Sequence, residues 1–354
     1  MRVVDCFGPP RERGRVHGES LRAEVAEALG RWEAARLSGP AGPASIGAYA
    51  AALVGETRLM AMVRDRTPGL YEELVGIAEG AGQPLDLIAA WNLMDEQWWF
   101  EGRDAPPPGC SLAALPVAGG HVMAQTMDLP VHMDGGQVVL RLGGPDMAET
   151  LLLSAPGLIG MTGVTASGLA IGVNTLLMLN HDAGGLPVAF ALRHALAARD
   201  AEAAAARLAG LRHASGQHYA AVDRARIVSL ECSAGGCVTV DRNGPALLHT
   251  NHPFASTDID PRSEARLARA AWARSTHARL DWLERSVPAR AGADAVQALF
   301  DAEDAPICLP RGALTSFSFA AVLYELGETV RARMRAGPAG SGDWVELGFG
   351  EVRG

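Results

Sequence analysis

A proline-rich break divides this sequence into two parts with different patterns. Residues 102–109 read GRDAPPPG, and three successive prolines exclude both helix and regular strand pairing. Before the break, from Arg11 to about Phe100, apolar residues recur at three- and four-residue spacing, which predicts helices. From Cys110 onward, short apolar runs separated by Gly, Pro and Asp predict strands. The break therefore predicts an exposed linker between a helical first quarter and a strand-rich remainder.

The part after the break alternates blocks of strands with blocks of helices. In order, the patterns predict strands from Cys110 to about Asn180, helices over 188–211, strands over 218–250, helices from Pro261 to about Asp301, and closing strands. This order is typical of stacked sheets between helical layers, an α+β arrangement. The 354 residues, 48% of them hydrophobic, are enough to fill such a core.

Charge and composition exclude several classes of function. The 31 basic and 40 acidic residues give a net charge of -9 without an arginine-rich stripe, so we expect no nucleic-acid partner. The sequence contains no lysine, which excludes Schiff-base chemistry, Ser-Lys dyads and a P-loop lysine. The uncharged segment from Leu151 to Asn180 has the length of a membrane helix, but Pro156 and five glycines indicate paired strands, and we expect no membrane.

The cysteines and the first residues bear on the cellular compartment. Five cysteines are an odd number, and they are widely spaced in a chain long enough to fold without disulfide staples. The first residues, MRVVDCFGPPRERG, lack the apolar run of a signal peptide. A reducing cytoplasm is therefore the expected location.

The cysteine at the end of the break allows two interpretations. Cys110 directly follows Gly109 and could be a small apolar core residue, as most free cysteines are. Alternatively, its thiol attacks the Gly109 carbonyl and water cleaves the resulting thioester, which leaves Cys110 at a new N-terminus. The freed α-amino group, with a reference pKa of about 7.7 to 8.0, would then be a base on the same residue as the thiol. No papain-type Cys-His-Asn spacing and no G-x-S-x-G motif offers another nucleophile.

Several stretches follow the order and approximate spacing of one known family. They are FGPPRERGRVHGESLRAEVAEAL, YEELVGIAEGAGQPLDLIAAWN, DAPPPGCSLAAL, HVMAQTMDLP, GLAIGVNTL, FALRHALAARD, SLECS and LLHTNHP, and they cover nearly the whole chain. On these motifs the chain resembles the isopenicillin N acyltransferase family of the N-terminal nucleophile (Ntn) hydrolases. The resemblance implies a four-layer αββα sandwich with an N-terminal helical segment. It also implies a zymogen that cleaves itself after Gly109, with a helical α chain (residues 1–109) and a catalytic β chain (residues 110–354) that associate afterwards.

By this resemblance four residues are expected at the catalytic centre. Cys110 matches the nucleophile, Asp128 in QTMD matches an acid near the catalytic amine, and Asn251 in HTNH matches a donor to the oxyanion. Ser233 in LECS matches a serine implicated in maturation and catalysis. Structural alternatives stay open: Asp128 and Asn251 are also ordinary turn residues, and Ser233 could bond to its own backbone at a strand end.

Further candidates come from the same comparison of motifs. Asn251 lies between His249 and His252, but we expect no metal because no further ligand pair with zinc spacing is present. Asn174 in GVNT and Arg193 in ALRHAL match family residues and are candidates for substrate binding. A turn or edge position for Asn174, and a structural role for Arg193, are the alternatives.

The family's penicillin-forming members have an arginine in the C-terminal part that can hold a substrate carboxylate. The corresponding loop, ICLPRGALTSF, is shorter in this chain. Arg311 is one candidate for that arginine, but an alignment on the following strand places Thr315 there instead. Penicillin as a substrate is therefore an open question at this point.

Together these observations predict a cysteine Ntn hydrolase that hydrolyses or transfers acyl groups of linear amides through a Cys110 thioester, without a cofactor. Hydrolysis is preferred because water is always present, and because the missing lysines disfavour a strong coenzyme A phosphate site. The alternatives are an acyl-coenzyme A-dependent acyltransferase of the penicillin type, or an uncleaved, non-catalytic binding protein. The expected partner is a small acyl amide or acyl thioester, and a homo-oligomer stays open.

Overall fold

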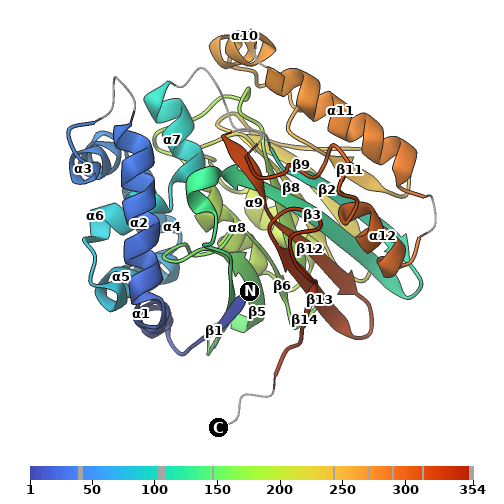
Figure 1. Ribbon diagram of the computed structural model, residues 1–354, viewed down its shortest axis with the longest axis horizontal. Coiled ribbons are helices and arrows are strands. Elements are labelled where there is room, and N and C mark those ends of the chain that lie inside the picture. Colours follow the sequence, from blue (N-terminus) through green and yellow to red (C-terminus); the bar gives the residue numbers. More distant parts are fainter. Residues whose placement is uncertain are drawn as a thin grey trace.

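Two stacked β-sheets form the centre of the protein (Figure 1). The computed structural model describes residues 1–38, 43–102, 109–145, 147–241, 244–269, 271–288, 291–312 and 315–350. Most of the predicted linker, residues 103–108, lies outside these ranges.

The larger sheet has eight strands and the smaller sheet six. In spatial order, the larger sheet contains β1 (Arg2–Phe7), β4 (Val138–Gly144), β5 (Met147–Ser154), β6 (Thr162–Thr165), β7 (Ala170–Thr175), β8 (Gln217–Val222), β9 (Ile227–Ser233) and β10 (Gly236–Thr239). The smaller sheet contains β11 (Leu247–His249), β2 (Ser111–Val117), β3 (Gly120–Pro130), β12 (Ser316–Leu326), β13 (Val330–Ala336) and β14 (Val345–Leu347). The strands pair antiparallel, except that β1 and β4 are parallel.

Helices cover the outer face of each sheet. The helices α8 (Val188–Leu196) and α9 (Ala201–Ala209) pack on the larger sheet, and α11 (Ala271–Ser286) and α12 (Ala293–Phe300) pack on the smaller one. The sheets meet closely at β7, where a side chain in place of Gly172 would overlap Leu112 of β2. Strand β12 is buried along almost its whole length, as its continuous apolar run predicts for a strand covered on both faces. The predicted αββα sandwich is therefore confirmed.

The described residues of the first quarter of the chain form seven helices beside the larger sheet (Figure 1). They are α1 (Pro10–Ser20), α2 (Arg22–Leu37), α3 (Ile46–Glu56), α4 (Leu59–Arg66), α5 (Pro68–Ala81), α6 (Leu85–Trp91) and α7 (Met94–Glu101). The helical prediction for this region is confirmed. The short helix α10 (Pro261–Arg269) reaches back to it, because Leu267 packs on Trp98 of α7.

The N-terminus differs from the purely helical segment that the sequence predicts. Residues Arg2–Phe7 form β1, an edge strand of the larger sheet, with Val4 and Cys6 buried and Asp5 exposed. The main hydrophobic core accordingly contains residues from both sides of the Gly109-Cys110 junction. The first 109 residues are therefore packed into the same body as the rest.

Two other sequence predictions concern the cysteines and the uncharged segment. The sequence analysis expected no disulfide staple to be needed, and the structure contains one disulfide, between Cys232 and Cys237, which the pairing of β9 with β10 places directly opposite each other. The segment from Leu151 to Asn180 contributes to β5, β6 and β7, as predicted. Across the described ranges, no single helix is long and apolar enough to cross a membrane, and only the bent pair α3 and α4 passes that test jointly.

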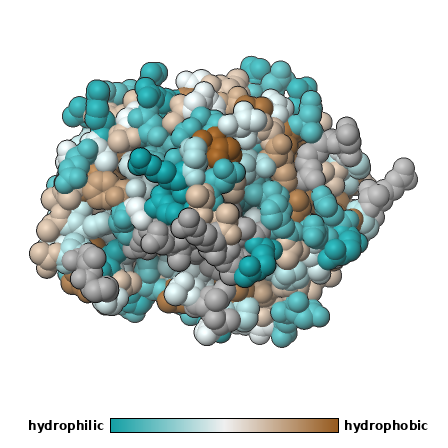
Figure 2. Space-filling view, turned by 90° about the horizontal axis from the view of Figure 1, so that it is seen from above, coloured by the Kyte–Doolittle hydropathy of each residue, from teal (hydrophilic) through white to brown (hydrophobic). Residues whose placement is uncertain are grey.

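The outer surface carries few large apolar side chains. Among the described residues the exposed ones are Val3, Leu37, Val131, Val238 and Val345. Figure 2 shows hydrophobic and hydrophilic residues interspersed on one face.

The contact between α1 and α5 depends on four glycines. At Gly14 and Gly18 of α1, and at Gly76 and Gly80 of α5, an added Cβ would overlap backbone atoms of the opposite helix. The two backbones can therefore approach closely only because these positions carry no side chain.

We expect Gly76→Ala to lower the free energy of unfolding by about 1 to 3 kcal/mol, because the new methyl group would force α1 and α5 apart. Gly30→Ala in α2 is the matched control, since nothing lies within 4 Å of its Cβ position, and it should raise stability by up to about 1 kcal/mol. Urea unfolding of both variants measures the difference. Equal effects would contradict the role assigned to this helix contact.

Candidate active site

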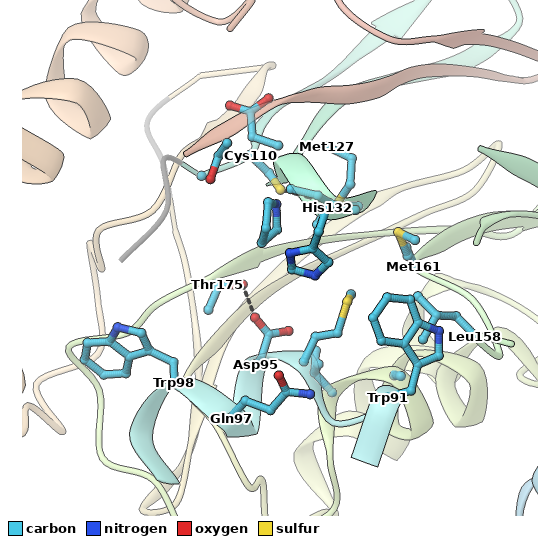
Figure 3. A pocket seen from close by; sticks show the side chains of 18 of the residues that line it. Trp91, Asp95, Gln97, Trp98, Cys110, Met127, His132, Leu158, Met161 and Thr175 are labelled. Carbon is cyan, nitrogen blue, oxygen red and sulfur yellow. Dashed lines mark hydrogen bonds between the residues drawn. The ribbon is translucent and has the colours of Figure 1, made fainter. Parts of the chain in front are cut away.

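A cavity of about 430 Å³ is lined by both parts of the chain. Its apolar lining includes Trp32, Trp91, Met127, Leu158, Met161 and Leu192. Four of the residues predicted from sequence also line it: Gly109, Cys110, Asp128 and Asn251. Figure 3 shows Cys110 and Met127 above the cavity, with Trp91, Leu158 and Met161 together on one side. The cavity therefore combines a cysteine thiol with a large apolar wall.

Cys110 immediately precedes β2 and is held through its backbone. Its carbonyl oxygen accepts hydrogen bonds from Asn174 Nδ2 at 3.0 Å and from Arg279 at 2.7 Å. The thiol lies 3.3 Å from the Met127 sulfur and is only 6% exposed. Burial, together with the negative charge of Asp128, raises the pKa of the thiol to about 12. The thiol is therefore neutral at physiological pH and needs a base before it can act as a nucleophile.

Asp128 lies on β3, next to the thiol. Its Oδ1 accepts a hydrogen bond from Ser318 Oγ at 2.7 Å, across the β3 and β12 pair. Burial raises the pKa of Asp128 to about 6, although Arg279 and the Ser318 hydrogen bond each favour the charged form. A carboxyl group with this pKa can exchange a proton near neutral pH.

The side-chain amide of Asn251 lies in close contact with Gly109, the residue before Cys110. A Cβ at Gly109 would overlap the side-chain amide of Asn251, so only glycine fits at this position. Asn251 Nδ2 donates to the Thr175 carbonyl at 3.0 Å, and Oδ1 accepts from Arg279 at 3.0 Å. The backbone N–H of Asn251 donates to Thr276 Oγ1 at 2.8 Å. These bonds fix the amide of Asn251, a residue that lines the cavity, and leave the second N–H group of Nδ2 without a partner among them.

Arg279 links these groups, and the sequence analysis missed it. It contacts the Cys110 carbonyl, the Ser111 hydroxyl at 3.0 Å and the Asn251 amide, while only 2% of it is exposed. The sequence does contain a signal, because Thr276, Arg279 and Leu283 recur at helical spacing and are all buried on one face of α11. A buried arginine on the apolar face of a helix points to a buried polar partner.

Asn174 lies behind the cavity rather than in its lining. Its Nδ2 donates to the Cys110 carbonyl, and its Oδ1 is hydrogen-bonded to His218 Nδ1 at 2.9 Å. The His218 ring stacks on the His249 ring, with ring centres 3.6 Å apart. His249 in turn contacts Glu231 at 3.0 Å. Asn174 therefore anchors the nucleophile to a fully buried polar network. His249, the neighbour of the HTNH asparagine in sequence, belongs to the same network through Glu231 and His218.

The remaining three candidates lie away from the cavity lining. Ser233 ends β9, and its Oγ donates to Asp258 Oδ2 at 2.6 Å. Arg193 makes a two-fold hydrogen bond to the buried carboxylate of Glu73 at 2.8 and 2.9 Å. Arg311 makes a two-fold bond to Asp134 at 2.7 and 3.0 Å on the surface.

Thr315, the alternative to Arg311, does line the cavity, as does its neighbour Ser316. The alignment on the following strand therefore agrees with the geometry. No arginine of the shortened loop reaches the cavity among the residues that the structure describes.

Comparisons with known proteins show which proteins the chain is similar to. The family model described as acyl-coenzyme A:6-aminopenicillanic acid acyl-transferase matches residues 149–318, which include Asn174, Asn251 and Arg279. A relative in Emericella nidulans, the 40 kDa form of acyl-coenzyme A:6-aminopenicillanic-acid-acyltransferase, is 27% identical over 256 residues, covering 71% of this chain and 69% of that protein. The predicted family resemblance is therefore confirmed: the chain is similar to the acyl-coenzyme A:6-aminopenicillanic acid acyl-transferases. Both matches are to acyltransferases, so the prediction of an enzyme is confirmed.

Solved structures give more distant similarities. Penicillin V acylase from Agrobacterium tumefaciens shares 12% identity, with a TM-score of 0.43 over 68% of this chain and 86% of that one. The Gly-1 mutant of Anbu from Hyphomicrobium shares 8% identity, with a TM-score of 0.32 over 66% of this chain and 89% of that one.

The two arginines predicted to bind substrate should differ in their effect on stability. We expect Arg193→Met to lower the free energy of unfolding by about 3 to 5 kcal/mol, because it would remove the closest partner of the buried Glu73 carboxylate. Arg311→Met removes an exposed ion pair and should change stability by at most about 1 kcal/mol. Chemical unfolding measures both, and similar losses would contradict the structural role given to Arg193.

Proposed function

We propose that this protein is a self-cleaving acyl hydrolase or acyltransferase in which Cys110, as the new N-terminal residue, carries the acyl group. The observation that carries the proposal is the placement of the Gly109-Cys110 bond. The bond lies at the wall of an apolar cavity, with Gly109 against the Asn251 amide and with Asp128 beside the thiol. A buried core cysteine requires none of these neighbours.

Maturation would begin with attack of the Cys110 sulfur on the Gly109 carbonyl carbon. The S–C bond forms, the C–N bond breaks, and the nitrogen of Cys110 takes up the proton that the thiol has lost. Asp128 is the nearby group whose pKa of about 6 allows it to relay that proton. Water then hydrolyses the thioester, which leaves a carboxylate on Gly109 and a free thiol and amine on Cys110.

Turnover would use the same atoms on an external substrate. The free α-amine of Cys110, with a reference pKa of about 7.7 to 8.0, accepts the thiol proton and later protonates the leaving amine. The N–H group of Asn251 that is not bound to Thr175 can donate to the oxyanion of the tetrahedral intermediate. Arg279 fixes the amide orientation that this donation needs. An acyl thioester on Cys110 then passes to water or to an amine.

The cavity supports an apolar acyl group. Tryptophan, methionine and leucine side chains form most of one wall, and such a wall stabilises a flexible aliphatic or aromatic acyl chain by removing it from water. We favour hydrolysis over transfer to 6-aminopenicillanate because Arg311 is held by Asp134 outside the cavity. Transfer from acyl-coenzyme A, the reaction named for the relative from Emericella nidulans, is the alternative.

Self-cleavage has a simple signature in the mass of the purified protein. From 109/354 and 245/354 of 37.0 kDa, we expect fragments of about 11 and 26 kDa. Cys110→Ala should remain a single chain, while Cys308→Ala, which removes another buried free thiol, should still cleave. Intact-protein mass spectrometry decides the matter. Active wild-type protein at its full mass would overturn the proposed mechanism.

The oxyanion role of Asn251 is tested in protein that has already matured. Asn251→Ala should lower kcat for an acyl amide by about 10² to 10³, because the tetrahedral intermediate would lose a donor. Asn180→Ala is the control, since Asn180 bonds Asp258 outside the cavity and should leave kcat within about threefold. Steady-state kinetics on both variants gives the comparison. A loss below about threefold for Asn251→Ala would assign the residue to structure alone.

A further inference from the structure

The cavity contains a second carboxylate that the proposed reaction does not use. Asp95, in the first turn of α7, lines the cavity, and its Oδ1 accepts a hydrogen bond from Thr175 Oγ1 at 2.9 Å. The carbonyl of the same Thr175 accepts the Asn251 amide. Figure 3 shows Asp95 and Thr175 on the side of the cavity opposite Trp91 and Leu158. Asp95 therefore lies on the polar wall that also holds the proposed oxyanion donor.

No basic side chain balances this carboxylate within the described part of the chain. Asp95 forms no ion pair there, and burial raises its pKa with only the Thr175 hydrogen bond acting against that rise. Of the basic side chains in the cavity, Arg36 is held by Glu101 and Gln97. His132 is neutral near pH 7, since burial, aided by nearby arginines, lowers its pKa to about 4. A carboxylate whose negative charge has no cation nearby raises the free energy of a mostly apolar cavity, unless a ligand brings a cation to it.

The two walls of the cavity thus differ in chemistry. One wall offers apolar surface for an acyl chain, while the other offers Asp95 beside the reaction centre. We propose that Asp95 is a specificity-determining residue, which pairs with an ammonium group on the substrate and excludes substrates with a carboxylate at that position. This inference rests on the proposed function and names its substrate class: an acyl amide whose polar part carries a protonated amine.

A cation site at Asp95 would disfavour the molecule after which the relative from Emericella nidulans is named. The name 6-aminopenicillanic acid describes a molecule with a carboxylic acid, which would be repelled by Asp95 if it lay against this wall. With Arg311 outside the cavity, no compensating cation is supplied by the shortened loop among its described residues.

Binding can be measured without catalysis. Cys110→Ala should keep the uncleaved chain and its cavity, and its affinity for octylammonium, octanol and octanoate can be compared by calorimetry. We expect octylammonium to bind at least about tenfold more tightly than octanol, and octanoate to bind most weakly. In the double variant with Asp95→Asn, which can still accept the Thr175 hydrogen bond, the tenfold preference should fall to within about threefold.

A matched control removes an acid elsewhere. Asp86 lies at the exposed start of α6, outside the cavity, so Asp86→Asn should leave the preference for octylammonium unchanged. A preference that survives Asp95→Asn, or tighter binding of octanoate than of octylammonium, would overturn the inference.

A turnover measurement separates this inference from the proposed function. Mature protein would be given N-octanoyl ethylenediamine and the neutral N-octanoyl ethanolamine, and we expect at least about tenfold higher kcat/KM for the cationic amide. Cys110-dependent hydrolysis of both amides at equal rates would refute the ammonium specificity while supporting the hydrolase. Asp95-dependent binding of octylammonium without Cys110-dependent hydrolysis of either amide would refute the hydrolase while supporting the cation site.

Discussion

The contact between Gly109 and the Asn251 amide sets the position of the chain at its junction. Because no side chain fits at residue 109, the backbone passes directly over the amide that is proposed to hold the oxyanion. Arg279 fixes that amide from α11 and also binds the Cys110 carbonyl. The two sheets and the α11 layer therefore act together to hold one peptide bond and one thiol in place.

Burial gives this site its proton chemistry. Desolvation raises the pKa of the Cys110 thiol to about 12 and that of the Asp128 carboxyl to about 6. At neutral pH the thiol therefore keeps its proton, while the carboxyl exchanges one readily. A neutral thiol is stable in an apolar cavity, and it becomes a nucleophile only when a base receives its proton. Cleavage would create that base on the same residue, which links maturation to activity.

Much of the fold follows from patterns that are visible in the sequence. The closing strands were predicted, and the continuous apolar run of β12 (Ser316–Leu326) suits a strand covered on both faces, which needs no alternation. The strand β1 was missed, since it is short and forms only through pairing with β4, which is distant in the sequence. The Cys232–Cys237 disulfide likewise depends on strand register, which spacing alone does not reveal.

The candidate site was predicted only in part. The motifs around Cys110, Asp128 and Asn251 identified residues that do meet at one cavity. Arg279 and Asp95 were missed because their roles depend on which face of a helix turns toward the core, and on what lies opposite. Arg311 was a reasonable candidate from chain order, but the fold directs it to Asp134 on the surface.

The central claim, that Cys110 carries the acyl group as an N-terminal residue, can be tested on the protein during turnover. A reaction with an acyl amide is quenched in acid, and the peptides are mapped by mass spectrometry. The account predicts a peptide that begins at Cys110 and carries the acyl mass on sulfur, in a bond that hydroxylamine removes. An active protein whose peptide still spans Gly109 and Cys110, with no acyl mass on the sulfur, would contradict it.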